Sequence, residues 1–267
     1  NKGLIMKGNW IKKELCELNK ENMDLLLNFK IPGIIIKNFI SYDICQEVSN
    51  RLIATNFSGY DHLNNIPVQQ LGLCHNQYAH ADKEIYFSKC NAAEKEIKKI
   101  YKNLNINPVN KIINLLNENL DMNVGIYEEE GFGKYFAGAF RSFKGHGRLH
   151  ADHAPSHIKQ SWAVTELVKQ LTWNIYYCIY EQKGGELIIY DTIHTDKNDH
   201  MKVDNEYYFP YEVLEREDHI KVRPNVGDLI IFNTQNFHEI LGQPNGNRIS
   251  QTSFMGLTKS GNLKLWS

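Results

Sequence analysis

The second half of the chain is a succession of short apolar segments separated by glycine- and asparagine-rich turns. The turns include Lys183-Gly184-Gly185 and Asn225-Val226-Gly227, and a further one spans residues 244–247. The segments with the length and the β-branched and aromatic content of strands are residues 135–143, 172–180, 186–191, 220–223, 228–233, 248–257 and 263–266. Many short strands joined by turns of this kind are typical of a β-sandwich or a jelly roll. This pattern therefore restricts the second half to an all-β core.

The first 121 residues have a different pattern, in which apolar residues recur at helical spacing. Ser41 is placed to cap one helix, and Asp82 to cap another. Asn107-Pro108 predicts an N-cap followed by proline in the first helical turn. Residues 10–29 are also predicted to be helical, and residues 34–36 are predicted to form a short strand.

We therefore predict an α+β protein in which residues 1–121 are mainly helical support and residues 122–267 form a β-sandwich or jelly-roll core. No long linker separates the two halves, so we expect a single domain over residues 1–267. Within the β half, one helix is predicted near residues 156–170. The polar stretch 192–217 is longer than an ordinary connection, which favours a lid or a binding loop.

Composition narrows the classes of function. The chain has 267 residues, of which 42% are hydrophobic, and this is enough to bury a core without a disulfide or metal staple. Its formal net charge of −1 provides no excess of Lys and Arg for phosphate contacts, which argues against nucleic acid as a partner. No apolar run approaches the ~18 residues of a membrane span, so no membrane partner is expected.

The five cysteines are scattered and include no C-x-x-C pair. An odd number without pairing indicates a reducing compartment and argues against a disulfide framework or a zinc knuckle. The first thirty residues mix Lys, Glu and Asn among apolar positions, unlike a secretory signal. We therefore expect a cytoplasmic protein, and the sequence leaves its oligomeric state open.

A histidine and a carboxylate lie two residues apart in His150-Ala151-Asp152. In an extended segment such residues project to the same side, so His150 and Asp152 are placed to bind one metal ion together. His238 lies beyond the apolar segment 228–233 and supplies a second imidazole. Two histidines and one carboxylate form the facial triad typical of non-haem Fe(II) oxygenases, which leaves open positions for other ligands.

Arg248 and Ser250 follow shortly after His238 and share one face of a predicted strand. A keto acid such as 2-oxoglutarate can take two of the open metal positions, and O₂ can take the third. Its far carboxylate then needs a planar, permanently charged partner, for which the arginine fork is suited and to which a neighbouring hydroxyl can add a hydrogen bond. The H-x-D motif alone is a weak signal, whereas its combination with a distant histidine and R-x-S is much stronger.

These motifs, together with several flanking segments, resemble the Fe(II)/2-oxoglutarate-dependent oxygenase superfamily. The flanking segments are Tyr135-Phe136-Ala137-Gly138, Trp173-Asn174-Ile175-Tyr176, Gly184-Gly185-Glu186-Leu187, Gly227-Asp228-Leu229-Ile230-Ile231-Phe232-Asn233 and Leu265-Trp266-Ser267. More narrowly, they resemble the group of radical halogenases and hydroxylases that act on free amino acids such as lysine. The resemblance covers roughly residues 130–267.

The resemblance implies a double-stranded β-helix (jelly-roll, cupin-like) core with packed N-terminal helices. It further implies Fe(II) as the metal, 2-oxoglutarate and O₂ as cosubstrates, and hydroxylation of an unactivated C–H with release of succinate and CO₂. In this group the halogenases replace the carboxylate of the triad by a small residue. Because this chain keeps Asp152, the resemblance implies a dioxygenase that hydroxylates a small substrate, such as a free amino acid or a derivative.

Further residues are candidates for the cosubstrate and the substrate. Asn174 and Tyr176 lie on the polar face of one predicted strand, and they either face solvent or reach the cosubstrate. Arg141, His146, His153 and Trp266 are candidates for contact with the substrate. Arg141 and His146 precede the H-x-D motif and are suited to a substrate carboxylate. His153 points away from Asp152 on strand geometry, and Trp266 is suited to an aromatic wall, although plain core packing is the alternative.

The histidines at positions 62, 75 and 80 lie in a predicted loop of the front half. We expect them to be solvated, although a loop folded over the pocket is the alternative. Other functions also remain open at this point: a non-catalytic jelly roll that senses 2-oxoglutarate or a metal, a zinc hydrolase with the same ligands, or a radical halogenase. Arg248 at a cosubstrate position argues against the hydrolase, and Asp152 argues against the halogenase.

Overall fold

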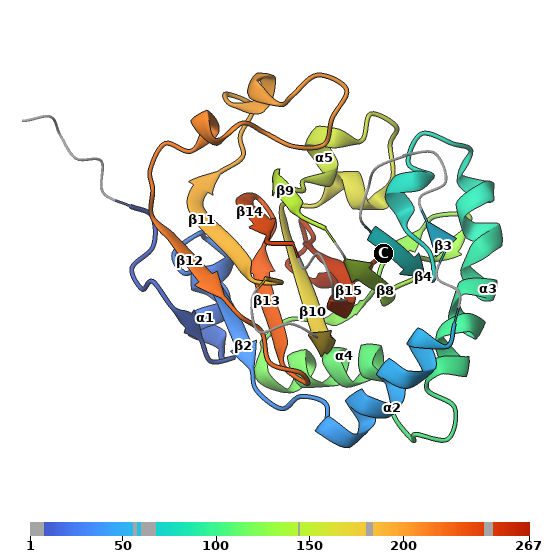
Figure 1. Cartoon of the computed structure of the whole chain (residues 1–267). Helices are drawn as coiled ribbons and strands as arrows, with labels where there is room; N and C mark the ends of the chain where they lie inside the picture. The colour runs from blue at the N-terminus through green and yellow to red at the C-terminus, as the bar shows by residue number, and fades with distance from the viewer. Residues whose placement is uncertain (1–7, 56–57, 60–67, 144, 180–183, 243–247) are drawn as a thin grey trace, which may run out of the picture.

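Two β-sheets pack face to face, and helices cover the outer side of the larger one (Figure 1). The computed structural model describes residues 8–55, 58–59, 68–143, 145–179, 184–242 and 248–267. His62, Tyr180, Lys183 and the predicted turn at 244–247 lie outside the described residues.

The larger sheet is built mainly from antiparallel strands. Its spatial order is β1 (Leu15–Cys16), β2 (Gly33–Ile36), β13 (Leu229–Asn233), β10 (Lys169–Ile179), β15 (Arg248–Leu257), β8 (Ala139–Phe143), β4 (Val68–Leu71) and β3 (Ser58–Gly59). The strand β16 (Leu263–Trp266) pairs with β15 and, in parallel, with β5 (Val124–Ile126). The two longest strands, β10 and β15, lie side by side at its centre.

The smaller sheet has the order β12 (His219–Val222), β11 (Leu187–Ile193), β14 (Asn236–Ile240) and β9 (Gly147–His150). Its inner face packs on the larger sheet, because Leu187 and Ile189 of β11 share an apolar cluster with Tyr176, Ile230 and Phe232. A separate two-stranded hairpin joins β6 (Glu128–Glu129) to β7 (Gly133–Lys134). The facing sheets confirm the predicted α+β class with a jelly-roll core.

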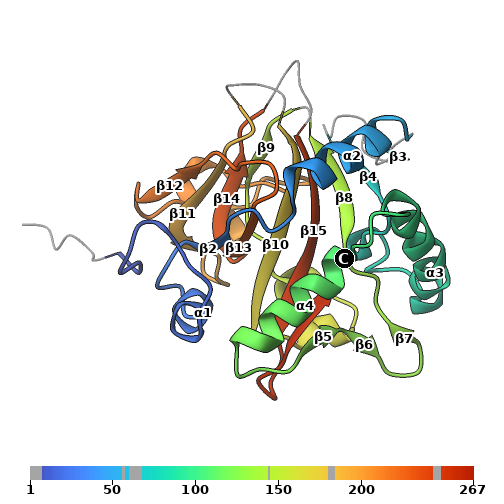
Figure 2. The same ribbon diagram turned by 90° about the horizontal axis from the view of Figure 1, so that it is seen from below.

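The helices in the described residues are α1 (Lys20–Leu27), α2 (Tyr42–Ile53), α3 (Lys83–Ile100), α4 (Pro108–Asn119) and the short α5 (Ala154–His157). Of these, α1, α2 and α4 begin at side chains that cap them. The predicted caps Ser41 and Asn107 accept hydrogen bonds from the backbone N–H groups of Ile44 and Asn110. Asp82 stands at the N-cap position of α3 without such a side-chain bond. Figure 2 shows α2 and α4 running across β10 and β15.

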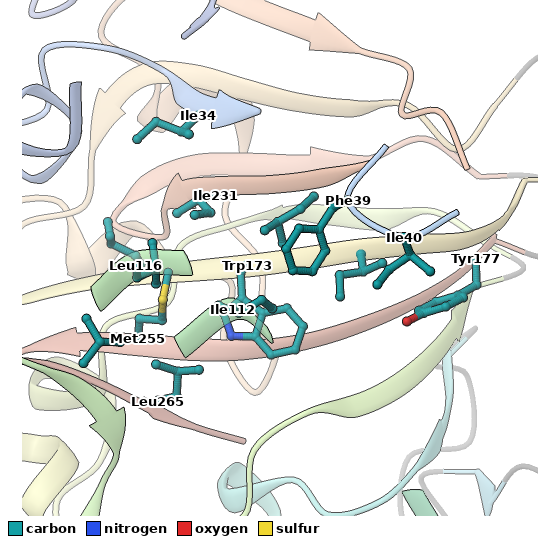
Figure 3. Packing of buried hydrophobic residues seen from close by; sticks show 14 of the residues in the cluster. Ile34, Phe39, Ile40, Ile112, Leu116, Trp173, Tyr177, Ile231, Met255 and Leu265 are labelled. Atoms are coloured by element: carbon teal, nitrogen blue, oxygen red, sulfur yellow. The ribbon is translucent and has the colours of Figure 1, made fainter. Parts of the chain in front are cut away.

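Strand β10 separates the core from the space between the sheets. Its residues Leu171, Trp173, Ile175 and Tyr177 are buried in the cluster beneath the helices, to which Ile112 and Leu116 of α4 also belong (Figure 3). Its even-numbered residues Thr172, Asn174 and Tyr176 face the inter-sheet pocket. The polar face of this strand therefore lines a pocket instead of facing bulk solvent.

Two predicted helices are wrong over most of their length. In residues 10–29 only α1 is helical, because Leu15 and Cys16 pair with β2 and Asn19 starts the helix by accepting a hydrogen bond from the N–H of Asn22. Residues 156–170 contain the end of α5, a 3-10 turn (Ala163–Glu166) and the start of β10. Pairing of Lys169 and Gln170 with β15 overrides helical spacing there.

The front half contributes strands as well as helices. β2 pairs with β13, and β4 pairs with β8, so residues on both sides of position 122 form one continuous sheet. We infer from this shared sheet that the chain forms a single domain. Within the residues that the structure describes, no helix is long and apolar enough to cross a membrane. The polar stretch 192–217 contains 3-10 turns at Asp199–Met201 and Tyr211–Val213.

The packing of α4 on the sheet predicts a stability effect. Leu116 is fully buried in the main cluster, so Leu116→Ala leaves a cavity, and we expect it to lower the free energy of unfolding by about 2–5 kcal/mol. The matched control on the same helix, Asn114→Ala, is exposed and should change it by less than about 0.5 kcal/mol. Urea unfolding followed by circular dichroism measures both, and equal effects would contradict this packing.

Candidate active site

The pairing of β9 with β14 brings the predicted metal ligands together. His150 stands opposite His238 in the register of these strands. The Nε2 atoms of both rings lie 3.5 Å from the same oxygen, Oδ2 of Asp152. One ligand atom from each residue lies within 4.8 Å of the others, so the three side chains are placed to share one metal ion.

Backbone carbonyls orient both imidazoles. The Nδ1 atom of His150 is 2.7 Å from the carbonyl oxygen of Arg148, and that of His238 is 2.8 Å from the carbonyl oxygen of Asn236. A ring N–H that donates to a carbonyl fixes the tautomer in which Nε2 keeps its lone pair. Both histidines therefore direct Nε2 toward the Asp152 carboxylate, where this nitrogen is available to bind a metal ion.

Asp152 is held in place through its backbone. Its N–H donates to the carbonyl of Thr234 (2.9 Å), and the Thr234 hydroxyl donates to the carbonyl of Asp152 (2.8 Å). The carboxylate remains partly open to the pocket, with 27% of its side-chain area exposed. A fixed backbone with an accessible carboxylate is the arrangement that a metal ligand needs.

The charges of the three residues are coupled. Burial opposes ionisation of Asp152, but His150 and His238 outweigh it and hold the pKa of Asp152 well below its usual range. Burial likewise opposes protonation of His150, yet the Asp152 carboxylate raises its pKa. Burial and the neighbouring His150 lower the pKa of His238. The carboxylate is thus anionic, as binding of a cation requires.

Arg248 lies inside the same pocket and is 2% exposed. Its Nε donates to the carbonyl of Gly185 (3.1 Å), and its guanidinium carbon lies 4.9 Å from the ring centre of Tyr176. Burial lowers the pKa of Arg248, although a guanidinium keeps its charge. Among the described residues, no carboxylate pairs with it. A buried cation without an internal counter-charge is suited to an anionic ligand.

The other predicted cosubstrate residues lie next to Arg248. Tyr176 of β10 pairs with Ser250 of β15, beside a bulge in the ladder. Ser250, Asn174 and Tyr176 all line the pocket that contains the three candidate metal ligands. Burial raises the pKa of Tyr176, and Arg248 partly offsets that rise. The structure therefore brings all seven predicted metal and cosubstrate residues to one pocket.

The predicted substrate residues are divided between different places. Arg141 and Trp266 line the pocket. His146 is exposed, and its Nε2 lies 3.2 Å from Glu239, outside the pocket lining. His153 points away from the pocket into a neighbouring cleft, where its Nδ1 lies 2.6 Å from the Ser156 hydroxyl.

His75 is a pocket residue that the sequence did not reveal. We expected it to be solvated, but it is 1% exposed and lies in the 3-10 turn His75–Gln77, which forms part of the pocket wall. Its ring meets those of Trp162 (4.4 Å) and Tyr86 (5.1 Å) edge-on, and neither ring nitrogen has a hydrogen-bond partner in the described part of the chain. Burial lowers its pKa to about 4. The clustering of histidines in this loop was the only signal in the sequence.

Solved structures share this fold. An N-substituted L-amino acid dioxygenase from Burkholderia ambifaria is similar over 92% of this chain and 91% of its own, with a TM-score of 0.55 and 12% identity. A second structure of that enzyme, in complex with alpha-KG, matches with a TM-score of 0.54 and 14% identity. At such low identity the likeness shows the fold alone.

Sequence comparison supplies the family. Residues 9–267 match the family described as carrier-protein-independent halogenase WelO5, and the chain belongs to that family. The leucinostatins biosynthesis cluster protein S of Purpureocillium lilacinum is 30% identical over 65% of this chain and 72% of its own. The L-gamma-glutamyl-L-propargylglycine hydroxylase of Streptantibioticus cattleyicolor is 24% identical over 49% of this chain, which spans 48% of that protein. Family and fold confirm the expected class of enzyme, an Fe(II)/2-oxoglutarate-dependent oxygenase with a small-molecule substrate.

The position of Arg248 in the pocket predicts that its substitution weakens the binding of 2-oxoglutarate. Arg248→Lys keeps the charge but removes the planar fork, so we expect 2-oxoglutarate to bind more weakly by about 1.5–3 kcal/mol. Calorimetry under argon with Co(II) in place of iron measures this affinity. Arg223→Lys, at an exposed residue outside the pocket, serves as the matched control. An unchanged affinity in Arg248→Lys would exclude Arg248 as the carboxylate partner.

Proposed function

We propose that this protein hydroxylates an unactivated C–H of a small amino-acid-like substrate, with Fe(II) held by His150, Asp152 and His238. The observation that carries this proposal is the Asp152 carboxylate, whose Oδ2 lies 3.5 Å from both histidine Nε2 atoms. In a halogenase of this group the corresponding residue is small and leaves room for chloride. Here an anionic oxygen takes that place, which supports hydroxylation within a family described by its halogenase.

The residues present fit the metal and the cosubstrate. Two imidazole nitrogens and a carboxylate form a donor set for Fe(II). The buried guanidinium of Arg248, which has no carboxylate partner among the described residues, fits the far carboxylate of 2-oxoglutarate, with Ser250 and Tyr176 beside it. When bound, Fe(II) together with 2-oxoglutarate and O₂ supplies the oxidising power that replaces a C–H hydrogen by hydroxyl, with release of succinate and CO₂.

The protein residues contribute orientation and a dry environment. The carbonyls of Arg148 and Asn236 hold the imidazole rings, and Thr234 holds the backbone of Asp152. The apolar side chains of Leu187, Phe232 and Ile240 line the pocket and limit the access of water. An environment of this kind strengthens the interaction of Arg248 with an anionic ligand, because the local dielectric is low.

Arg141, His75 and Trp266 form the substrate side of the pocket in this proposal. Arg141 supplies a positive charge suited to a substrate carboxylate. His75 presents a neutral imidazole able to donate or accept a hydrogen bond. Support for an amino-acid-like substrate comes from the similarity to a hydroxylase of a glutamyl amino acid and to an N-substituted amino acid dioxygenase.

The first test is product analysis. Purified protein with Fe(II), 2-oxoglutarate and a mixture of amino acids and N-substituted derivatives is expected to form succinate and one product heavier by one oxygen. His150→Ala and His238→Ala should both abolish succinate formation, because each removes a metal ligand. Undiminished succinate in both variants would refute the proposed iron site. A product with chlorine in place of hydrogen would identify a halogenase, and tight 2-oxoglutarate binding without succinate would identify a sensor.

A second test concerns His75. His75→Phe keeps an aromatic ring but removes both ring nitrogens, so we expect less hydroxylated product per succinate, at an affinity for 2-oxoglutarate within about threefold of the wild type. The exposed His219 provides the matched control His219→Phe. An unchanged ratio of product to succinate would exclude His75 from substrate positioning.

A further inference from the structure

A second group of metal-binding side chains lies close to the first but does not overlap with it. His157 ends α5, His194 follows β11, and Asp199 begins a 3-10 turn. The Nε2 atom of His194 lies 2.8 Å from Oδ1 of Asp199, and the Nε2 atom of His157 lies 3.8 Å from the same oxygen. One ligand atom from each residue lies within 4.8 Å of the others, which matches the spacing in the first group.

The two histidines of this group are incompletely satisfied. His194 is 2% exposed, and its Nδ1 atom has no hydrogen-bond partner among the described residues. The Nε2 atom of His157 is also buried without a hydrogen bond, since 3.8 Å from Asp199 is too long for one. Buried ring nitrogens in a folded protein normally have a partner, so the Nε2 atom of His157, which faces Asp199, points to a ligand that completes the group. The Nε2 atom of His194 is the ligand atom of the second histidine, because it is the nitrogen that lies next to Asp199.

The backbone holds the three side chains in place independently of one another. The N–H of His194 donates to the carbonyl of Gln235 (2.8 Å). Asn198 closes the loop before Asp199, because its Nδ2 donates to the carbonyl of Ile193 and its Oδ1 accepts from the N–H of Thr195, both at 2.9 Å. At the start of α5, the N–H of Ala154 donates to Gln170 (2.7 Å). A site built on fixed backbone needs little rearrangement to bind a cation.

We propose that His157, His194 and Asp199 bind a second divalent cation of the Zn(II) class. Two imidazole nitrogens and one carboxylate are common protein ligands of zinc, and a water molecule completes its tetrahedron. His157 borders a cleft that is also lined by His153 and Gln170. The side chain of Asp199 is 44% exposed, so water can reach the group. The proposal concerns binding only and does not depend on the proposed hydroxylation.

This cation has a structural consequence for the first site. α5 begins two residues after Asp152, so a metal bound at its last residue joins the segment that carries Asp152 to the loop after β11. We expect Zn(II) in the second site to restrict the movement of Asp152, because a metal bound to the folded state stabilises the elements that it joins.

The decisive experiment isolates the second site from the first. In the double variant His150→Ala/His238→Ala, Zn(II) titration by calorimetry after removal of metal with a chelator is expected to show one equivalent bound per chain. Adding Asp199→Asn or His194→Gln to this variant should abolish that binding. Adding His200→Ala, which removes an exposed histidine next to Asp199, should leave it intact.

Folding is checked in the same proteins. Zn(II) is expected to raise the melting temperature of the double variant by several degrees and to leave that of the Asp199→Asn derivative unchanged. Absence of Zn(II) binding in a folded double variant, or full binding in the folded His194→Gln and Asp199→Asn derivatives, overturns the proposal. Because the readout is metal stoichiometry, failure of the hydroxylation assay does not affect it.

Discussion

The pairing of β9 with β14, which has an irregularity between His238 and Ile240, is the constraint on which the rest of the site depends. It places His150 opposite His238, and the backbone bonds between Asp152 and Thr234 hold the carboxylate against both rings. Successive side chains of a strand point to opposite faces of the sheet. A shift of the pairing by one residue would therefore turn His238 out of the pocket. The strand register therefore determines whether a metal-binding group exists at all.

Strand β10 contributes to the hydrophobic core with one face and to the candidate active site with the other. One face buries Trp173 and Tyr177 beneath the helices, and the other presents Asn174 and Tyr176 to the pocket. The helices of the front half thus cover the outer face of the sheet whose inner face carries Arg248. Arg248 is buried, and in the described part of the chain no carboxylate pairs with it. This supports its proposed role, because a buried cation is costly unless an anionic ligand accompanies it.

Much of the site was predictable from local spacing, whereas part of the fold was not. The H-x-D motif and the Arg248–Ser250 pair depend only on strand geometry, and the structure brings them into one pocket. The helices predicted over residues 10–29 and 156–170 were wrong because pairing with distant strands outweighs local helical spacing. His75 and the group of His157, His194 and Asp199 escaped prediction because their members lie far apart in sequence or in loops.

The sequence by itself determined the class of enzyme and the residue types that are candidates for binding the metal and the cosubstrate. Residue type sets what a side chain can bind, and spacing within one strand sets which side chains share a face. Only the tertiary structure decided that His75 is buried in the pocket wall and that a second histidine–carboxylate group forms close to Asp152. Those features depend on contacts between segments distant in the chain, which no local pattern encodes.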